Sequence, residues 1–291
     1  MWNLAVEQLA HWQPGRKTAP GFVEQSRRLT EARAENPWLK SYSITRDRAD
    51  RWHVAFPVAP EPVPAPGIGD VVGVDRGVVV SAALSTGELL SAPTLRDTEK
   101  ARLLRLRRKL ARARRGSNRR GKVKTAIARL KARETDRRKD WVEKIGTRPA
   151  REFDVIGVEH LKITNMTRSA KGTADAPGRG VRQKAGLNQG VLANGWGQLV
   201  TRLEQKAPGR VVKVDPRYTS QSCSACGAAD RKARENEAAF RCRSCGFVAN
   251  ADVNAACDIR NAAGHAVAAR GGPPLGGPAN REPQHDLFLV G

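Results

Sequence analysis

The sequence predicts an α/β fold, and the prediction rests on three observations. Residues 71–75 are a continuous apolar run up to Asp75 and residues 153–158 repeat the pattern, which is typical of strands buried on both faces of a sheet. Residues 96–139 and 187–206 carry apolar side chains at helical spacing. Strands that alternate with helices along a chain pack as layers around a shared core, so the fold belongs to the α/β class.

The composition indicates nucleic acid as the partner. The chain has 291 residues, enough for about two domains, with 52 Lys and Arg against 29 acidic residues and a formal net charge of +23. An anionic membrane is the weaker alternative, because no long apolar run is present to span or anchor. Residues 1–15 lack the basic lead and the cleavage site of a secretory signal, so a cytoplasmic location is expected.

The front of the chain predicts a small piece that precedes the main domain. Helices are expected over 2–12 and 23–34, and a hairpin is expected in which 41–45 pairs with the alternating strand that begins at Trp52. Residues 59–67 are rich in proline and predict a stiff, extended linker. The expected domains are, in chain order, 1–58, the linker 59–67, a main domain over 68–264 and a disordered Gly/Pro-rich tail over 265–291.

The main domain begins with three predicted strands, over 71–75, 78–84 and 88–90. Asp75 ends the first of them among valines and stands next to Arg76. A buried carboxylate is costly unless it is paired or binds a metal. Asp75 therefore either pairs with Arg76 or caps a turn, or it belongs to a functional site.

Residues 96–139 carry twenty Lys or Arg against four acids, and with the following residues to 145 they predict a basic helical hairpin. Gly116, Ser117 and Asn118 separate its helices, whose narrow apolar seams are Leu103, Leu106 and Leu110, then Val123, Ile127 and Leu130. A solvated charged helix is the alternative, but charge of one sign favours a surface for phosphate backbones. The candidate nucleic-acid contacts are Arg105, Arg108, Lys109, Arg112, Arg115, Arg119 and Arg120.

The strand over 153–158 repeats the first pattern, since it too ends in a carboxylate, Glu159, whose alternative interpretation is a paired structural acid. A loop over 162–184, rich in Gly, Arg and Lys, is expected to act as a lid or a nucleic-acid contact. A short strand is expected over 210–214. The helix over 187–206 is expected to bury Leu192, Trp196, Leu199 and Leu203.

The cysteine spacing predicts a metal site. Two CxxC pairs are separated by fifteen residues, which is a zinc-site pattern: Cys223, Cys226, Cys242 and Cys245. Gly227 and Gly246 follow the pairs, where a tight turn often needs a positive φ. Four thiolates complete a tetrahedral shell, so the zinc would be structural. Disulfides are the weaker alternative, because nothing indicates an oxidising compartment, and Cys257 remains as a small buried side chain.

Asp252 begins an alanine-rich segment that predicts a helix as far as Ala263. Taken alone, Asp252 is more often an N-terminal cap, and Asp258 a solvated acid on the same helix. Together with Asp75 and Glu159, however, Asp252 supplies a third carboxylate that could converge on the ends of the two strands. Three such acids can hold two divalent cations about 3.5–4 Å apart for phosphodiester hydrolysis, and Mg²⁺ prefers oxygen ligands of this kind.

Five motifs resemble those of the TnpB/OrfB family of transposon-encoded proteins, which are relatives of the type V CRISPR effectors. They are GVDRGV around Asp75, VIGVEHL around Glu159, YTSQSCSACG, FRCRSCGF and NADVNAA, and they occur in the family's order within 68–264. The resemblance implies a RuvC-like nuclease of the RNase H fold with a zinc ribbon, over 218–250, inserted before the last acid.

The resemblance also implies roles for residues and partners. Asp75, Glu159 and Asp252 would be the catalytic residues that bind Mg²⁺ or Mn²⁺, and the four cysteines would bind zinc. A guide RNA made from the transposon end would direct cleavage of matching DNA. Members are often called transposases, although DNA recombination and transposition are the work of a partner enzyme.

The sequence departs from the family at its front. WNLAVEQLAHW and ENPWLK resemble early recognition helices, and SYSITRDRADRWHVAFPV resembles the last strands of a β-barrel domain. The first barrel strands and most of the helices between are missing, so the join near 39–41 resembles an internal deletion. His160 stands where the family usually has an acid or an amide. The predicted function is an RNA-guided, metal-dependent DNA endonuclease; the alternatives are a non-cleaving nucleic-acid-binding protein and a decayed transposon remnant that lacks guide recognition.

Overall fold

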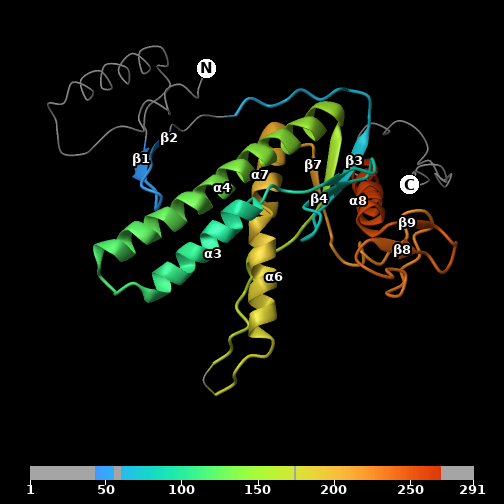
Figure 1. The fold of residues 1–291 in the computed structure, drawn as a ribbon. Helices are drawn as coiled ribbons and strands as arrows, with labels where there is room; N and C mark the ends of the chain where they lie inside the picture. Colours follow the sequence, from blue (N-terminus) through green and yellow to red (C-terminus); the bar gives the residue numbers. More distant parts are fainter. Residues whose placement is uncertain (1–42, 56–59, 174, 270–291) are drawn as a thin grey trace, which may run out of the picture. The chain divides into compact units, whose positions relative to one another are not determined.

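The computed structural model describes residues 43–55, 60–173 and 175–269 (Figure 1). The chain divides into two compact units: Met1–Pro60 with Leu95–Asp136, and Glu61–Thr94 with Arg137–Gly291. Helix α4 (Asn118–Glu152) belongs to the first unit up to Asp136 and to the second from Arg137. The helices expected over 2–12 and 23–34, and the expected tail from 270 onward, lie outside the described residues. The disorder expected from 265 is wrong for 265–268, which form the last turn of α8 (Ala251–Ala268).

The first unit contains the expected hairpin. Strands β1 (Ser43–Arg46) and β2 (Trp52–Ala55) pair in antiparallel fashion. The Asp47 carboxylate accepts hydrogen bonds from the backbone N–H groups of Ala49 (2.8 Å) and Arg51 (2.9 Å), which fixes the turn between the strands. The pairing expected between 41–45 and the strand that begins at Trp52 is thereby confirmed from Ser43 onward.

The basic helical hairpin is also present, as α3 (Asp97–Arg112) followed by α4. Leu103 of the first predicted seam and Leu130 of the second are buried and pack together with Leu95 in one cluster between the helices. The break expected at 116–118 ends at Asn118, where α4 begins. Helix α4 continues to Glu152, past the predicted end at 145, because its second half is apolar on one side and packs on the sheet of the second unit.

A five-stranded mixed sheet forms the centre of the second unit, which confirms the α/β class. Its strands are β3 (Val71–Asp75), β4 (Ala82–Leu84), β5 (Leu89–Leu90), β6 (Val155–Glu159) and β7 (Val211–Val214). The spatial order is β5-β4-β3-β6-β7. Strands β3, β6 and β7 run parallel, whereas β4 is antiparallel to both of its neighbours.

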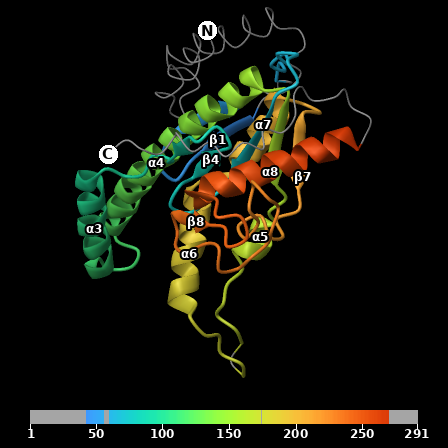
Figure 2. The same ribbon diagram turned by 90° about the vertical axis from the view of Figure 1, so that its right-hand side faces the viewer.

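Helices cover both faces of this sheet. On one face, Val72, Val74, Ile156 and Val158 pack against α7 (Trp196–Lys206) and the second half of α4. On the other face, α8 (Ala251–Ala268) lies across the strands (Figure 2) and packs against β3, β6 and β7. Since successive side chains of a strand point to opposite faces, alternate residues of β3 and β6 face α8.

Two predicted elements differ from the observed ones. The strand expected over 78–84 is reduced to β4, because the side chains of Asn194 and Trp196 bind the carbonyl oxygens of Val78 (2.9 Å) and Gly77 (3.1 Å), which a longer strand would need for pairing. The helix expected over 187–206 is two helices, α6 (Val181–Ala193) and α7, separated at Gly195, whose φ is +69°.

That helix break changes which side chains are buried. Trp196, Leu199 and Leu203 are buried in α7, as expected. Leu192 is 60% exposed, and Val191 is buried in its place, because α6 ends before the face of α7 begins. Helix α6 also begins inside the segment expected to be a loop over 162–184, which contains the short α5 (Ile163–Met166) as well.

Candidate functional site

The parallel strands β3 and β6 place Asp75 and Glu159 at the same edge of the sheet. Gly73 pairs with Gly157 and Val74 pairs with Val158, so Asp75 and Glu159 occupy the next position of the same register. Neighbouring strands lie about 4.8 Å apart. Ligand sites in open α/β sheets lie outside the carboxyl ends of the parallel strands, which is where both carboxylates lie.

Two glycines let α8 approach this edge. Gly73 and Gly157 stand two residues before the two carboxylates and therefore face α8 with them. A Cβ atom on Gly73 would lie 2.5 Å from the backbone nitrogen of Arg260 and closer still to the carbonyl oxygen of Ala256. One on Gly157 would lie 2.8 Å from Cβ of Ala263. The pattern Gly-Val-acid in both strands therefore provides the close packing of α8 as well as the carboxylates.

Asp252 lies in the first turn of α8, but it does not cap the helix. The cap is Asn250, whose side chain accepts hydrogen bonds from the backbone N–H groups of Asp252 (3.0 Å) and Val253 (3.2 Å). The capping interpretation of Asp252 is therefore wrong. Its carboxylate instead forms an ion pair with Nη2 of Arg234 at 3.0 Å.

The carboxylates influence one another electrostatically. The pKa of Asp75 is raised to about 7, mainly by burial and also by the negative charges of Glu159 and Asp252, against a hydrogen bond from the Arg76 backbone N–H. Burial also raises the pKa of Glu159, an effect opposed by a hydrogen bond from Thr219 and by the charge of Arg76. Two carboxylates that resist ionisation at one edge of a sheet favour a bound cation.

Arg76 does not neutralise Asp75. Its guanidinium is buried and donates hydrogen bonds to the carbonyl oxygens of Glu159 and Trp196. Within the described part of the chain, no ion pair joins Arg76 to Asp75. The alternative in which Asp75 is a structural acid paired with its neighbour is therefore wrong, and Arg76 instead ties the end of β6 to the start of α7.

Three residues that the sequence reasoning missed complete the surroundings of the carboxylates. Thr219 is buried and its hydroxyl donates to Oε1 of Glu159 at 2.5 Å. Arg234 holds Asp252 and lies close enough to lower the pKa of Asp75. Asn254 is buried between α8 and the first CxxC turn. Threonine four positions before a CxxC pair and arginine in a charged loop carry no periodic signal, and only the fold brings them to the site.

The three carboxylates are not yet gathered as a metal shell. Among residues 43–55, 60–173 and 175–269, the four cysteines are the only group of three or more ligand side chains with all ligand atoms within 4.8 Å of one another. The donor set of the carboxylates nevertheless fits Mg²⁺ or Mn²⁺, because it consists of hard oxygen ligands whose charged forms need compensation. Asp252 is ion-paired with Arg234 in this arrangement.

The zinc-type module is assembled more tightly. Strands β8 (Ala239–Arg241) and β9 (Val248–Asn250) pair beside the cysteines. The sulfur atoms of Cys223 and Cys245 are 3.8 Å apart and those of Cys226 and Cys242 are 3.6 Å apart. In this cluster the cysteines could bind zinc.

The turns of the module support this geometry. Gly227 and Gly246 have φ values of +76° and +78°, as the sequence predicts. The backbone N–H groups of Ala225 and Cys226 donate to the Cys223 sulfur. Cys257 lies apart from the cluster, with its sulfur 3.6 Å from the carbonyl oxygen of Ser85.

His160 follows Glu159 and lies at the surface. Its backbone N–H donates to the carbonyl oxygen of Val214 at 2.8 Å. A cavity of about 480 Å³ opens beside it at the ends of β6 and β7, and Lys162, Lys213 and Arg217 also line it. The residue that departs from the family pattern therefore lines a hollow next to the candidate site, whose other charged residues are three cations and Asp215.

The candidate nucleic-acid contacts belong to α3, α4 and the turn between them. Six of the seven are exposed: Arg105, Arg108, Lys109, Arg112, Arg115 and Arg119. Arg120 is half-buried and donates to the carbonyl oxygens of Leu110 (2.7 Å) and Ala113 (3.0 Å), so it closes the C-terminus of α3.

No helix in the described ranges is long and apolar enough to cross a membrane.

Comparison with known families gives two matches. Residues 55–170 match OrfB_IS605, described as "Probable transposase", and residues 196–259 match the "Cas12f1-like, TNB domain". The chain is thus similar to a transposase family over the first stretch and to a Cas12f1-like module over the second. They confirm the resemblance to the TnpB/OrfB family over these two stretches.

Two curated proteins are similar to this chain over most of its length. The "Putative RNA-guided DNA endonuclease InsQ" of Escherichia coli (strain K12) is 38% identical over 84% of this chain and 62% of its own length. The "Putative RNA-guided DNA endonuclease" of Streptomyces pristinaespiralis is 33% identical over 87% of this chain and 63% of its own. The chain thus spans less than two thirds of the length of these relatives. The solved "Cas12f1-sgRNA-target DNA complex" is 20% identical with a TM-score of 0.42, over 76% of this chain and 55% of that chain.

Proposed function

We propose that this chain is a transposon-associated, RNA-guided DNA endonuclease with a RuvC-type active site on an RNase H-like fold. One observation carries the proposal: Asp75 and Glu159 end adjacent parallel strands, and Asp252 is close enough to raise the pKa of Asp75. The names of the relatives support the reaction, since both are called RNA-guided DNA endonucleases.

Asp75, Glu159 and Asp252 would hold Mg²⁺ or Mn²⁺, which supplies an activated water and stabilises the leaving oxygen of a phosphodiester. The protein residues orient these ligands. Thr219 donates to one oxygen of Glu159 and so directs the other oxygen to the site. Arg76 holds the carbonyl end of β6 in place. Arg234 compensates the charge of Asp252.

The zinc would be structural and held by the four cysteines, with no position left for water. Its role is to shape the segment that carries Thr219 and Arg234 to the carboxylates. DNA and a guide RNA from the transposon end would be the partners, met in the cytoplasm, and the cations of α3 and α4 would contact their phosphates. The excess of exposed cations on this hairpin supports that assignment.

The test uses any RNA that copurifies with the protein. That RNA is sequenced, DNA matching it is prepared with varied flanking sequences, and cleavage is measured with and without Mg²⁺. We expect Mg²⁺-dependent cleavage that Asp75→Asn lowers by at least about 10³-fold, while binding to nucleic acid is retained. Asp70→Asn is the matched control, because Asp70 is exposed at the opposite end of β3.

Two results would contradict the proposal. One is equal cleavage by wild type and Asp75→Asn, which would indicate a contaminating nuclease. The other is guide-dependent DNA binding without cleavage under any flanking sequence, which would favour the non-cleaving alternative. Absence of any copurifying RNA together with absence of cleavage would favour the decayed remnant.

A further inference from the structure

Tyr218 lies in the turn between β7 and the cysteine module, and it is the one exposed aromatic residue in the described ranges. It is 59% exposed, whereas the described tryptophans and phenylalanines are buried or half-buried. Its side chain has no hydrogen-bond or ion-pair partner among the residues that the structure describes. A single exposed ring is common on protein surfaces and is not a site by itself. The backbone and the surroundings of Tyr218, however, set it apart.

The backbone of Tyr218 is strained. Its φ is +67°, and among the described residues Asp50 is the only other one besides the glycines with a positive φ. Aspartate tolerates the left-handed region because its short polar side chain can form local hydrogen bonds, whereas a bulky ring has no such compensation. Strained backbone of this kind clusters at functional sites, where the surrounding structure holds it in place. The outlier therefore calls for a role of the tyrosine ring.

The turn itself does not need that ring. The carbonyl oxygen of Tyr218 accepts hydrogen bonds from the backbone N–H groups of Gln221 (2.7 Å) and Ser222 (2.8 Å). The next residue, Thr219, is buried and donates to Oε1 of Glu159 at 2.5 Å. A glycine at position 218 could keep all of these contacts and would adopt the positive φ with less strain. The ring is thus not explained by the hydrogen bonds that hold the turn.

This turn brings the ring to the rim of the candidate site. Consecutive Cα atoms are about 3.8 Å apart, so Tyr218 stands one residue from the side chain that binds Glu159. The hollow beside His160 extends as far as Arg217, the residue before Tyr218. A nucleic-acid strand that reached Glu159 would therefore have a base within reach of an exposed aromatic face.

Charge alone does not provide for a strand at this edge. Lys213 is ion-paired with Glu204 at 2.6 Å, and Arg217 lies 3.8 Å from Asp215. Of the three cations that line the hollow, only Lys162 lacks an acidic partner among the described residues. Stacking on an aromatic ring does not depend on charge, since every base has a π-face. Tyr218 thus offers an attraction that the largely paired charges of the hollow do not.

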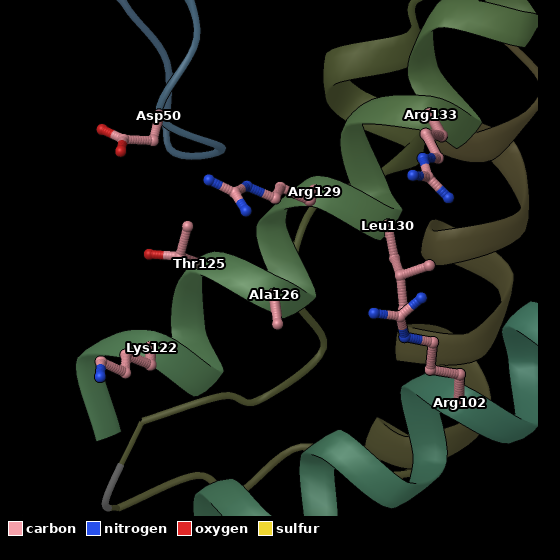
Figure 3. Close-up of a pocket in the computed structure, with 8 residues that line it drawn as sticks. All are labelled: Asp50, Arg102, Lys122, Thr125, Ala126, Arg129, Leu130 and Arg133. Atoms are coloured by element: carbon pink, nitrogen blue, oxygen red, sulfur yellow. The ribbon is translucent and has the colours of Figure 1, made fainter. Parts of the chain in front are cut away.

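The hollow of the first unit is of a different kind (Figure 3). None of the residues that line it is aromatic, and four of them are cations: Arg102, Lys122, Arg129 and Arg133. Cations without a stacking surface suit phosphates, which all nucleic acids share. The ring of Tyr218 suits a base instead.

We propose that Tyr218 binds the strand that enters the carboxylate site, by stacking its ring on one nucleotide base. Stacking accepts any base, so the contact holds the strand without reading its sequence. The ligand is single-stranded nucleic acid, and the inference rests on the proposed function for that choice. It concerns binding alone, and the experiment below is carried out without cleavage.

The test compares three single variants of the full chain with the wild type. Tyr218→Gly removes the ring, Tyr218→Phe keeps it, and Arg217→Gln removes an exposed cation from the neighbouring position. Fluorescence anisotropy in Mg²⁺-free buffer measures affinity for a short strand of thymidines and for the same strand with abasic sites throughout. Photocrosslinking to a strand that contains 5-iododeoxyuridine, followed by peptide mapping, locates the stacked base.

We expect the preference for thymidine over abasic strand to fall at least about fivefold in Tyr218→Gly, the effect of losing one base stack. Tyr218→Phe should keep the preference, and Arg217→Gln should weaken binding to both strands alike. The crosslink should map to residue 218 and disappear in Tyr218→Gly. The Tm of Tyr218→Gly should stay the same or rise by up to about 4 °C, because the backbone strain is relieved.

An unchanged preference in Tyr218→Gly, or crosslinks that map only to other residues, would overturn the proposal. A lower Tm together with a lower zinc content in Tyr218→Gly would overturn it too, because the ring would then be part of the fold. Failure of the proposed function gives a different result. A wild type that never cuts, with variants that bind as expected, would refute the nuclease and leave the assignment of Tyr218 standing.

Discussion

The two groups of candidate metal ligands differ in how far the chain alone assembles them. The cysteine sulfur atoms lie within 4.8 Å of one another, carried on tight turns that backbone N–H groups stabilise. The carboxylates come from two strands and a helix. The carboxylate on the helix, Asp252, forms an ion pair with Arg234. Local turns preassemble the first site, whereas the second depends on the packing of α8 on the sheet and remains open to change.

This difference has an electrostatic cause. Burial raises the pKa of Cys223 to about 12, so this thiol is neutral at pH 7 and approaches the other sulfur atoms without charge repulsion, and metal binding removes its proton. Carboxylates that are ionised at pH 7 repel one another in a buried site, so they stay apart or hold a proton until a cation arrives. The cysteine side chains should therefore keep the same positions with or without a metal ion. The positions and protonation of the carboxylates should change when a cation binds.

The largest effect is expected from the cysteines. Cys223→Ser with Cys226→Ser should reduce bound zinc from one per chain to none and unfold the module, because structural zinc contributes about 10–16 kcal/mol to the folding of isolated zinc peptides. Elemental analysis and limited proteolysis between 223 and 245 measure both. Cys257→Ser is the control and should leave the zinc content at one. A zinc content of zero in the wild type would contradict the prediction that the four cysteines bind zinc.

A smaller effect is expected from Asp75. Its pKa of about 7 in the folded protein exceeds the ordinary value of 3.8, so the folded state keeps a proton that the unfolded state has lost. Without Mg²⁺, stability should therefore fall as pH rises from about 4 to about 7, by at most about 4 kcal/mol.

Asp75→Asn removes this dependence and should be the more stable protein at pH 8 in Mg²⁺-free buffer, with the difference shrinking at pH 5. Thermal unfolding over this pH range measures it. Added Mg²⁺ should raise the Tm of the wild type but not that of the variant. A wild type whose stability relative to the variant stays constant or rises between pH 4 and 7 would show that folding does not raise the pKa of Asp75.

Arg234 is expected to give the smallest effect. Its ion pair with Asp252 is partly exposed and contributes about 1 kcal/mol, so Arg234→Gln should lower the Mg²⁺ concentration needed for half-maximal thermal stabilisation about fivefold. Arg231→Gln, an exposed arginine of the same loop, is the control. If the Mg²⁺ requirement rises in the Arg234 variant, the guanidinium helps to place Asp252 rather than competing with the cation.

The sequence predicts those parts of the fold and site whose cause is local. The buried strands, the CxxC turns and the hairpin seams follow from apolar runs, glycines and helical spacing within short windows. The break at Gly195 was missed, because glycine inside a periodic segment does not reveal whether its φ is positive. The shortening of β4 was missed because it depends on Asn194 and Trp196, more than a hundred positions away.

The carboxylate site shows the same limit. Strand ends carrying Asp75 and Glu159 could be read from the sequence, but their acid–base state depends on burial and on charges from three elements. Arg234 and Thr219 reach the site from the cysteine-containing segment, where neither has a periodic or spacing signal. The roles of the three carboxylates as catalytic residues stay a prediction that the experiments above address.

Asn254 connects the cysteine site, which would bind zinc, to the helix that carries Asp252 of the proposed magnesium site. Its side chain accepts from the Ser224 N–H (3.0 Å) and donates to the carbonyl oxygen of Ser222 (2.8 Å), so it joins the turn that contains Cys223 to the turn of α8 that follows Asp252. If zinc binding at the cysteines orders this shared segment, it lowers the free energy needed to order the segment when a cation binds the carboxylates. The coupling free energy between the two sites is the same in both directions. If the carboxylates bind magnesium as proposed, loss of zinc from the cysteines would therefore weaken magnesium binding.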